Sequence, residues 1–325
     1  MRKLSQALNT TIVTWCLIFI ACTAHAQTEE FPKKPVLVIS GPGPDTAVRL
    51  LANELTSIWN QQIVAQTIAG ASGKIASETV LKSKPDGYTL LSATSSLELA
   101  YFLGVNTVDV VNALTPVAMI NELPFILVVP SSKNIHSIQE LISYAKNNPG
   151  KLNYASGGNG TLPHLAAEML KQKARIEITH IPFKAADQAA IALLGGEVDM
   201  MFTSYPVVRG LIESGQLRIL AITSATRSLL LSKVPTLNEL GFDNFNFLSW
   251  TCLFAPDGLG LDRIGKIRKD VSLALTNPVL KQQFLNLGFE PTPNELIDPR
   301  ELTRFLKSDA MKLSEMLKQS GAKLD

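Results

Sequence analysis

The stretch that decides the fold is Leu152-Asn-Tyr-Ala-Ser156, followed by Gly157-Gly-Asn-Gly160 and Thr161-Leu-Pro-His164. This order of residues predicts a short strand, a glycine-rich loop and the start of a helix. Glycine lets the backbone turn sharply and approach a ligand, and a helix start offers unpaired N–H groups and the positive end of its dipole. The stretch therefore predicts an anion-binding loop without a charged side chain. For this loop taken alone, an ordinary strand-to-helix turn is the alternative.

Short apolar runs and helical patterns alternate along most of the chain, which predicts parallel strands joined by helices. The predicted strands are residues 36–39, 63–66, 88–93, 152–155, 176–181, 198–202 and 217–223. The predicted helices are residues 46–59, 74–82, 138–147, 162–173, 185–194, 261–275 and 278–287, with a last helix from Pro299. The alternation predicts an α/β fold.

The chain is long enough for two lobes. Without residues 1–26 it keeps 325 − 26 = 299 residues, more than one hydrophobic core usually organises. The apolar runs 125–129 and 247–254 are expected to cross between the lobes. We expect lobe 1 to comprise residues 27–124 and 249–325, and lobe 2 residues 125–248. Each lobe is expected to be a mostly parallel sheet flanked by helices, and two crossover strands join them.

The first 26 residues have the pattern of an export signal. Arg2 and Lys3 precede an apolar run at 11–21 that is too short for a membrane span, and Ala24-His25-Ala26 is a small-x-small cleavage pattern. We expect cleavage after Ala26 and a periplasmic protein. A lipoprotein acylated on Cys22 is the less favoured alternative, because residues 19–21 match the usual small residues poorly.

The composition argues against several classes of function. Loss of the two basic residues of the signal takes the formal charge from +2 to 0, which argues against nucleic acid as a partner. Cys252 is the only cysteine left, so no internal disulfide is possible. His136, His164 and His180 lack metal-ligand spacing, and the sequence has no nucleophile elbow or phosphate-binding loop motif. We therefore expect no metal, no cofactor and no catalytic residue.

Polar loops follow several predicted strands. Open α/β sheets bind ligands at the carboxyl ends of their strands, so these loops together favour a cleft that holds a small polar or anionic molecule by hydrogen bonds. For each loop alone, turn formation and helix capping are the alternative. The candidate ligand-binding residues are Ser40, Gly41, Gly43, Thr94, Ser95, Ser96, Ser156, Gly157, Asn159, Gly160, Thr161, His164, Phe183, Lys184, Ala185, Thr203 and Ser204.

Several short motifs occur in the order seen in a known family. They are Pro85-Asp-Gly-Tyr-Thr-Leu-Leu91, Thr115-Pro-Val-Ala118, Asn148-Pro-Gly-Lys-Leu-Asn-Tyr154, Leu194-Gly-Gly-Glu-Val-Asp-Met200, Val234-Pro-Thr236, and Ser249-Trp250 with Leu253-Phe-Ala-Pro256. Over nearly all of the mature sequence the chain resembles the periplasmic solute receptors of tripartite tricarboxylate transporters, the Bug receptors. The resemblance implies a type II periplasmic-binding-protein fold and a non-catalytic, monomeric receptor. Such a receptor passes a small organic acid or amino acid to the subunits of a membrane transporter.

Two segments of the first lobe depart from the family pattern. Ser40-Gly-Pro-Gly-Pro-Asp45 is several residues shorter than the usual first loop, and Thr67-Ile-Ala-Gly70-Ala-Ser-Gly73 replaces the usual Asn-Arg-Pro-Gly-Ala-Gly-Gly. Trp250 fits hinge packing and a cleft wall equally. Two alternatives therefore remain. The ligand can differ from that of the family, or the protein can be a periplasmic sensor that acts on a membrane signalling protein. An exported hydrolase is less favoured, because the sequence offers no nucleophile and base.

Overall fold

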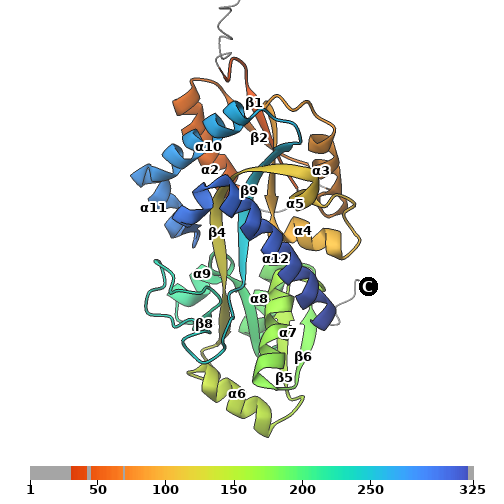
Figure 1. The fold of residues 1–325 in the computed structure, drawn as a ribbon. Helices are drawn as coiled ribbons and strands as arrows, with labels where there is room; N and C mark the ends of the chain where they lie inside the picture. The colour runs from red at the N-terminus through yellow and green to blue at the C-terminus, as the bar shows by residue number, and fades with distance from the viewer. Residues whose placement is uncertain (1–30, 42–44, 69, 321–325) are drawn as a thin grey trace, which may run out of the picture. The chain divides into compact units, whose positions relative to one another are not determined.

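The strands of the computed structural model form two sheets that share one strand, β4 (Leu114–Pro130) (Figure 1). The structure describes residues 31–41, 45–68 and 70–320, and the fold below lies in the unit Lys34–Asp325. The first sheet has the order β2 (Ile63–Thr67), β1 (Val36–Ser40), β3 (Thr89–Thr94), β9 (Leu248–Pro256) and β4, with the short β10 (Glu290–Pro291) on β4. The second has the order β6 (Ile178–Pro182), β5 (Leu152–Ser156), β7 (Met200–Ser204), β4 and β8 (Leu217–Ile222).

Both sheets follow the same plan. In the first sheet β9, which comes from the second sheet, lies between β3 and β4. In the second sheet β4, which comes from the first, lies between β7 and β8. This is the type II strand order. Pairing within β1–β3 and within β5–β7 is parallel, whereas every pairing of β4 and β9 is antiparallel. The predicted α/β fold is confirmed. Each sheet is mixed because the crossing strands run against the parallel ones.

Strand β4 is much longer than the crossing strand predicted at residues 125–129. Two of its three prolines, Pro116 and Pro124, lie inside the strand and suggest interruptions in the sequence, because proline cannot donate to a strand ladder. The register of β4 on β9 shifts between Pro116 and Ala118. Pro124 is the last residue paired with β9 before Phe125 pairs with β7. Pro116 therefore lies at a shift in register and Pro124 at a change of partner strand, and β4 continues through both.

Helices follow the strands in sequence order. They are α2 (Thr46–Trp59), α3 (Lys74–Leu81), α4 (Ser95–Phe102), α5 (Val110–Ala113), α6 (Ile138–Asn147), α7 (Leu162–Ala174), α8 (Ala186–Gly195), α9 (Tyr205–Glu213), α10 (Leu261–Thr276), α11 (Pro278–Asn286) and α12 (Pro299–Ser320), with short 3-10 turns at η1 (Ala71–Gly73) and η2 (Asn294–Ile297). The predicted helices are present within a few residues. The sequence does not predict α4, α5 and α9. Serines begin α4, α5 has only four residues, and Pro206 lies in the first turn of α9.

The C-terminal helices return to the elements that begin the chain. Helix α10 packs on α2 and β4, and α12 packs on α4, α5 and β4 and also on α7. Trp250 of β9 is buried, and its Nε1 donates to Asp309 Oδ2 on α12 at 2.8 Å. Of the two roles open for Trp250, the structure supports packing of the crossing strand.

Candidate ligand-binding site

The candidate residues lie where the parallel strands end. The last residues of β1, β3, β5 and β7 are Ser40, Thr94, Ser156 and Ser204. Gly157 to Thr161 join β5 to α7, which contains His164, and Phe183 to Ala185 join β6 to α8. Gly43 and the export signal lie outside the described residues.

The interpretation of Ser95 and Ser96 as loop residues is wrong, because they are the first residues of α4. Ser95 is fully buried, and its Oγ lies 3.2 Å from Ser249 Oγ and accepts from Trp250 N–H at 3.4 Å. A hydroxyl that holds the start of β9 is not available to a ligand. Ser96 is exposed.

The glycine-rich loop after β5 contacts parts of both sheets. A Cβ on Gly157 would lie 3.1 Å from the backbone nitrogen of Ala186, at the start of α8. Gly160 has a positive φ of +68°, and a Cβ there would lie 2.8 Å from Leu103 Cδ1, at the end of α4. The loop therefore needs glycine for close approach at one position and for backbone conformation at another. The loop thus packs against α8, which lies beside the second sheet, and against the end of α4, which lies beside the first.

The helices that begin at these strand ends have no side-chain cap. Four of the N-cap residues are candidate residues, namely Thr94 for α4, Thr161 for α7, Ala185 for α8 and Ser204 for α9, and none of their side chains accepts a hydrogen bond from its helix. Helices α2 and α3, which follow β1 and β2, lack such a cap too, as does α10. The first N–H groups of an α-helix have no partner inside the helix. Pro163 of α7 and Pro206 of α9 carry no N–H, and the N–H of Gln188 in α8 donates to Asp187 Oδ1 at 3.0 Å. The remaining N–H groups of these first turns can take another acceptor.

Three helices elsewhere in the fold have side-chain caps, although α10, which follows the antiparallel strand β9, does not. Asp109, Ser137 and Asn277 accept N–H hydrogen bonds at the starts of α5, α6 and α11, and none of these helices follows a parallel strand. The interpretation of the polar strand-end residues as helix caps is therefore wrong for the hydroxyls of Thr94, Thr161 and Ser204. The other alternative, turn formation, holds for Thr161, whose Oγ1 donates to Gly158 O at 2.9 Å. A helix start without a side-chain cap can bind an anion.

The first loop uses its carboxylate within the protein. Asp45 Oδ2 accepts from Thr67 Oγ1 at 2.6 Å and lies 2.7 Å from Arg49 Nη2. The hydrogen bond from Arg49 is the main cause that lowers the pKa of Asp45. Thr67 stands where the family pattern has asparagine. The two departures in sequence thus contact each other, and they fix Asp45 by internal bonds.

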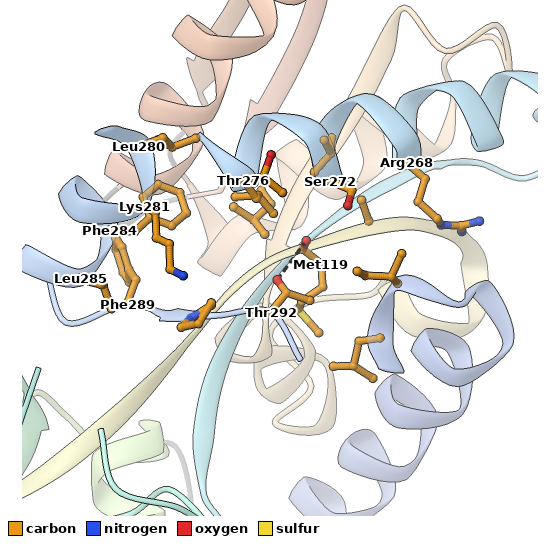
Figure 2. A pocket seen from close by; sticks show the side chains of 17 residues that line it. Met119, Arg268, Ser272, Thr276, Leu280, Lys281, Phe284, Leu285, Phe289 and Thr292 are labelled. Carbon is orange, nitrogen blue, oxygen red and sulfur yellow. Dashed lines mark hydrogen bonds between the residues drawn. The ribbon is translucent and has the colours of Figure 1, made fainter. Parts of the chain in front are cut away.

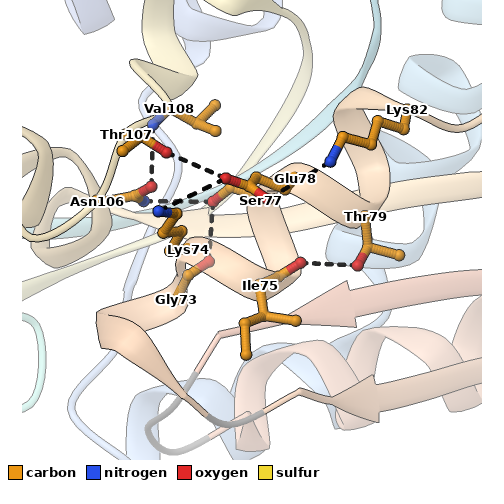
Figure 3. Close-up of polar contacts among 10 residues, drawn as sticks. All are labelled: Gly73, Lys74, Ile75, Ser77, Glu78, Thr79, Lys82, Asn106, Thr107 and Val108. Carbon is orange, nitrogen blue, oxygen red and sulfur yellow. Dashed lines mark hydrogen bonds and ion pairs between the residues drawn. The ribbon is translucent and has the colours of Figure 1, made fainter.

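The start of α3 is anchored in a similar way (Figure 3). Ser77 Oγ donates to Gly73 O at 3.1 Å, and Asn106 Nδ2 donates to Ser77 Oγ at 3.4 Å. Lys74, the first residue of α3, lies 3.9 Å from the Glu78 carboxylate. These contacts hold the end of the second altered segment against residues 106–108.

Two histidines stack beneath the glycine-rich loop. The rings of His164 on α7 and His180 on β6 lie 4.0 Å apart at 12°, and the Tyr154 ring stacks on His180 at 4.7 Å. His164 Nδ1 accepts the N–H of Gly160 at 3.0 Å. This nitrogen therefore carries no proton, and the ring is neutral with its proton on Nε2. His164 holds the loop as an acceptor.

His180 holds the same loop through Ser156. Its Nε2 lies 2.7 Å from Ser156 Oγ, which also accepts the N–H of Gly158 at 3.1 Å. Burial is the main cause that lowers the pKa of His180 to about 4, and the adjacent His164 lowers it in the same sense. Burial lowers the pKa of His164 as well. Both rings are therefore neutral near pH 7. From the sequence alone His180 is interpreted as a surface or structural residue. Its contact with Ser156 could not be predicted, because it depends on the β5–β6 register, which pairs Tyr154 with His180.

Several buried side-chain nitrogen and oxygen atoms near these strand ends have no hydrogen-bond partner among the described residues. They include Oγ of Ser40 and Oγ1 of Thr203, both predicted site residues, and both polar atoms of Asn121 on β4. Thr203 is 1% exposed and Asn121 is fully buried. An unpaired buried polar group costs about 1–3 kcal/mol. Such groups are expected where a ligand or ordered water completes the structure. Sequence reasoning missed Asn121, which lies inside an apolar run.

Neither a metal-binding cluster nor a membrane-spanning helix occurs among the described residues. No three His, Cys, Asp or Glu side chains there are grouped so that they could hold a metal ion. None of the helices there is long and apolar enough to cross a membrane.

Comparison with known proteins agrees with the fold. The model of the tripartite tricarboxylate transporter family receptors, TctC, matches residues 47–322, and the chain belongs to this family of solute-binding receptors, which are not enzymes. The expected resemblance is confirmed. Protein BugT of Bordetella pertussis is 32% identical over 317 residues, which cover 94% of this chain and 96% of that protein.

Two solved structures of similar proteins contain carboxylates. R. palustris Rpa4515 with adipate is 28% identical with a TM-score of 0.77, and the match covers 90% of this chain and 99% of that one. MatC from Rhodopseudomonas palustris with bound malate is 26% identical with a TM-score of 0.73, and the match covers 88% and 100%.

Proposed function

We propose that this receptor binds a small carboxylate-bearing solute at the strand ends of both sheets. The observation that carries the proposal is the set of helix starts without side-chain caps at Thr94, Thr161, Ala185 and Ser204. Several N–H groups and helix dipoles can stabilise a carboxylate without a buried cation. The adipate and malate seen in relatives have this chemistry.

In this proposal the ligand lies between lobe 1, residues 27–124 and 249–325, and lobe 2, residues 125–248. The close approach of Gly160 to Leu103 supports the idea that the two sets of loops meet. A ligand favours lobe closure only by contacting the closed form better than the open one, so it needs contacts from both lobes. The export signal supports cleavage after Ala26 and a periplasmic, monomeric receptor that delivers its ligand to a membrane carrier.

A negative charge at one of these helix starts tests the proposal. Ser204 is the N-cap of α9, with φ −80° and ψ 148°, and its side chain does not cap the helix. Ser204→Asp should cap α9 and stabilise the ligand-free protein by about 0.5–1 kcal/mol. It should weaken carboxylate binding at least about tenfold, because the new carboxylate competes for the same N–H groups.

The matched control is Ser137→Asp at α6, where the serine already caps the helix through the N–H of Glu140. Calorimetry with a panel of di- and tricarboxylates, amino acids and aromatic acids gives the affinities, and urea unfolding gives the stabilities. The proposal requires that Ser204→Asp gains stability and loses affinity while Ser137→Asp keeps its affinity. Equal affinities in both variants, or no heat from any class of ligand at millimolar concentration, would contradict it.

A further inference from the structure

A second pocket lies away from the strand-end loops, between β4, α10, α11 and η2 (Figure 2). Its volume is about 290 Å³. It is built on residues 118–120 of β4, next to the shifts in the β4–β9 register. None of its lining residues is a candidate for the carboxylate site. Small-ligand pockets start at a volume near ~300 Å³, so this one has room for a single ring or a short branched chain.

The lining of this second pocket is mainly apolar and contains no acid. Met119, Val271, Leu275, Phe284 and Phe289 are among its apolar side chains, and its two charged residues, Arg268 and Lys281, are both basic. A ligand with several polar groups would leave most of them unpaired against such walls, which costs free energy. The lining therefore favours an apolar body with one anionic group.

Most polar groups of the lining are already bonded to the protein. Thr276 Oγ1 donates to Leu273 O at 2.6 Å, and Thr292 Oγ1 donates to Met119 O at 3.3 Å. Arg268 Nε donates to Val117 O at 2.9 Å. These bonds tie the polar atoms to the backbone, so they do not select a ligand.

Lys281 differs from the other polar residues of the lining. Its backbone N–H donates to Asn277 O at 2.9 Å, but its exposed ammonium group makes no hydrogen bond or ion pair with residues 31–41, 45–68 or 70–320. Lys281 lies at the opposite end of the pocket from Arg268 in Figure 2, beside Phe284. An ammonium group at the edge of an apolar pocket attracts a carboxylate and leaves the apolar part of the ligand inside. Lys281 therefore supplies the anionic selectivity.

We propose that this pocket binds a monocarboxylate with a compact apolar body, which lies against Met119 and Phe284 while its carboxylate pairs with Lys281. The ligand class differs from that of the strand-end site, which offers N–H groups and hydroxyls. Binding at one site does not require binding at the other.

The methyl group of Met119 is the direct probe, because this residue is buried in the pocket wall. The mature protein, labelled with ¹³C at the methionine methyls, is titrated with 3-phenylpropionate and with its neutral analogue 3-phenylpropanol, and Met119→Leu assigns the resonance. The Met119 signal should shift with the acid at millimolar concentration. Lys281→Gln should weaken the acid roughly tenfold and leave the alcohol unchanged.

Three further variants make the result decisive. Lys269→Gln removes an exposed lysine of α10 outside the lining and should change nothing. Ser272→Phe fills the pocket and should abolish the shift. Ser204→Asp should leave the shift intact, which separates this proposal from the function proposed above. The proposal would be overturned by an unmoved Met119 signal, by equal affinity for the acid and the alcohol, or by a shift that survives Ser272→Phe. Equal affinity for the acid and the alcohol is the result expected if the pocket instead binds an apolar side chain of a partner protein.

Discussion

Acidification should destabilise the protein through the stacked histidines His164 and His180. The pKa of His180 is lowered from its ordinary value near 6.5 to about 4, chiefly by burial. The folded protein therefore holds the neutral ring, whereas the unfolded chain takes up a proton below about pH 6.5. Because the unfolded state binds more protons, stability falls as the pH drops from about 6.5 to about 4, and His180 causes no further loss below that.

The size of the effect follows from the shift. A lowering from 6.5 to about 4 corresponds to about 3 kcal/mol at ~1.4 kcal/mol per pKa unit, and partial exposure of the ring reduces this to about 2 kcal/mol. Glu168 and Lys171 act on His180 with opposite signs. Protonation of His164 would also remove the acceptor for the N–H of Gly160. Because burial lowers the pKa of His164 too, ligand affinity should fall only once the pH is below the ordinary pKa of histidine.

Urea unfolding of the wild type, His180→Gln and His136→Gln between about pH 7 and about pH 4 tests this reasoning. The wild type and His136→Gln, which changes an exposed histidine, should lose the same stability on acidification. His180→Gln should start lower at neutral pH and lose about 2 kcal/mol less. Parallel pH profiles for the wild type and His180→Gln would show that the pair does not titrate in this way.

Three other changes have definite expected outcomes. Gly160→Ala should cost more stability in urea unfolding than Gly196→Ala, which has a similar positive φ of +78° but open space around its Cβ and should cost about 1 kcal/mol; equal costs would refute the close contact. Trp250→Phe should cost about 1–3 kcal/mol, because it leaves the partly buried carboxyl group of Asp309 without its donor, and a neutral result in the same assay would exclude that bond. Burial raises the pKa of the Cys252 thiol, so a thiol reagent should label it only as fast as the protein unfolds; faster labelling would contradict its burial.

Local patterns predict most of the fold. The helices at residues 46–59 and 261–275 and the parallel strands are correct because hydrophobic periodicity depends on neighbours in sequence. The full length of β4 could not be predicted because of Pro116 and Pro124. Whether a strand can contain these prolines depends on its pairing with β7 and β9, which are far away in sequence.

The site is harder to predict than the fold. The sequence correctly places Ser204 near the end of a strand and Thr161 directly before a helix, but it cannot show whether their hydroxyls cap a helix. The stack of His164 on His180 depends on how α7 packs on β6, which no local pattern encodes. The buried and unpaired side chain of Asn121 could not be predicted either, because its burial results from the pairing of β4 with both β9 and β10.

A crystal structure of the mature protein with its tightest carboxylate ligand tests the central claim most directly. We expect carboxylate oxygens within hydrogen-bond distance of backbone N–H groups at the start of α4 in the first lobe and at the start of α7, α8 or α9 in the second. Ligand carboxylates held instead by lysine or arginine side chains, or lying away from these helix starts, would contradict the account.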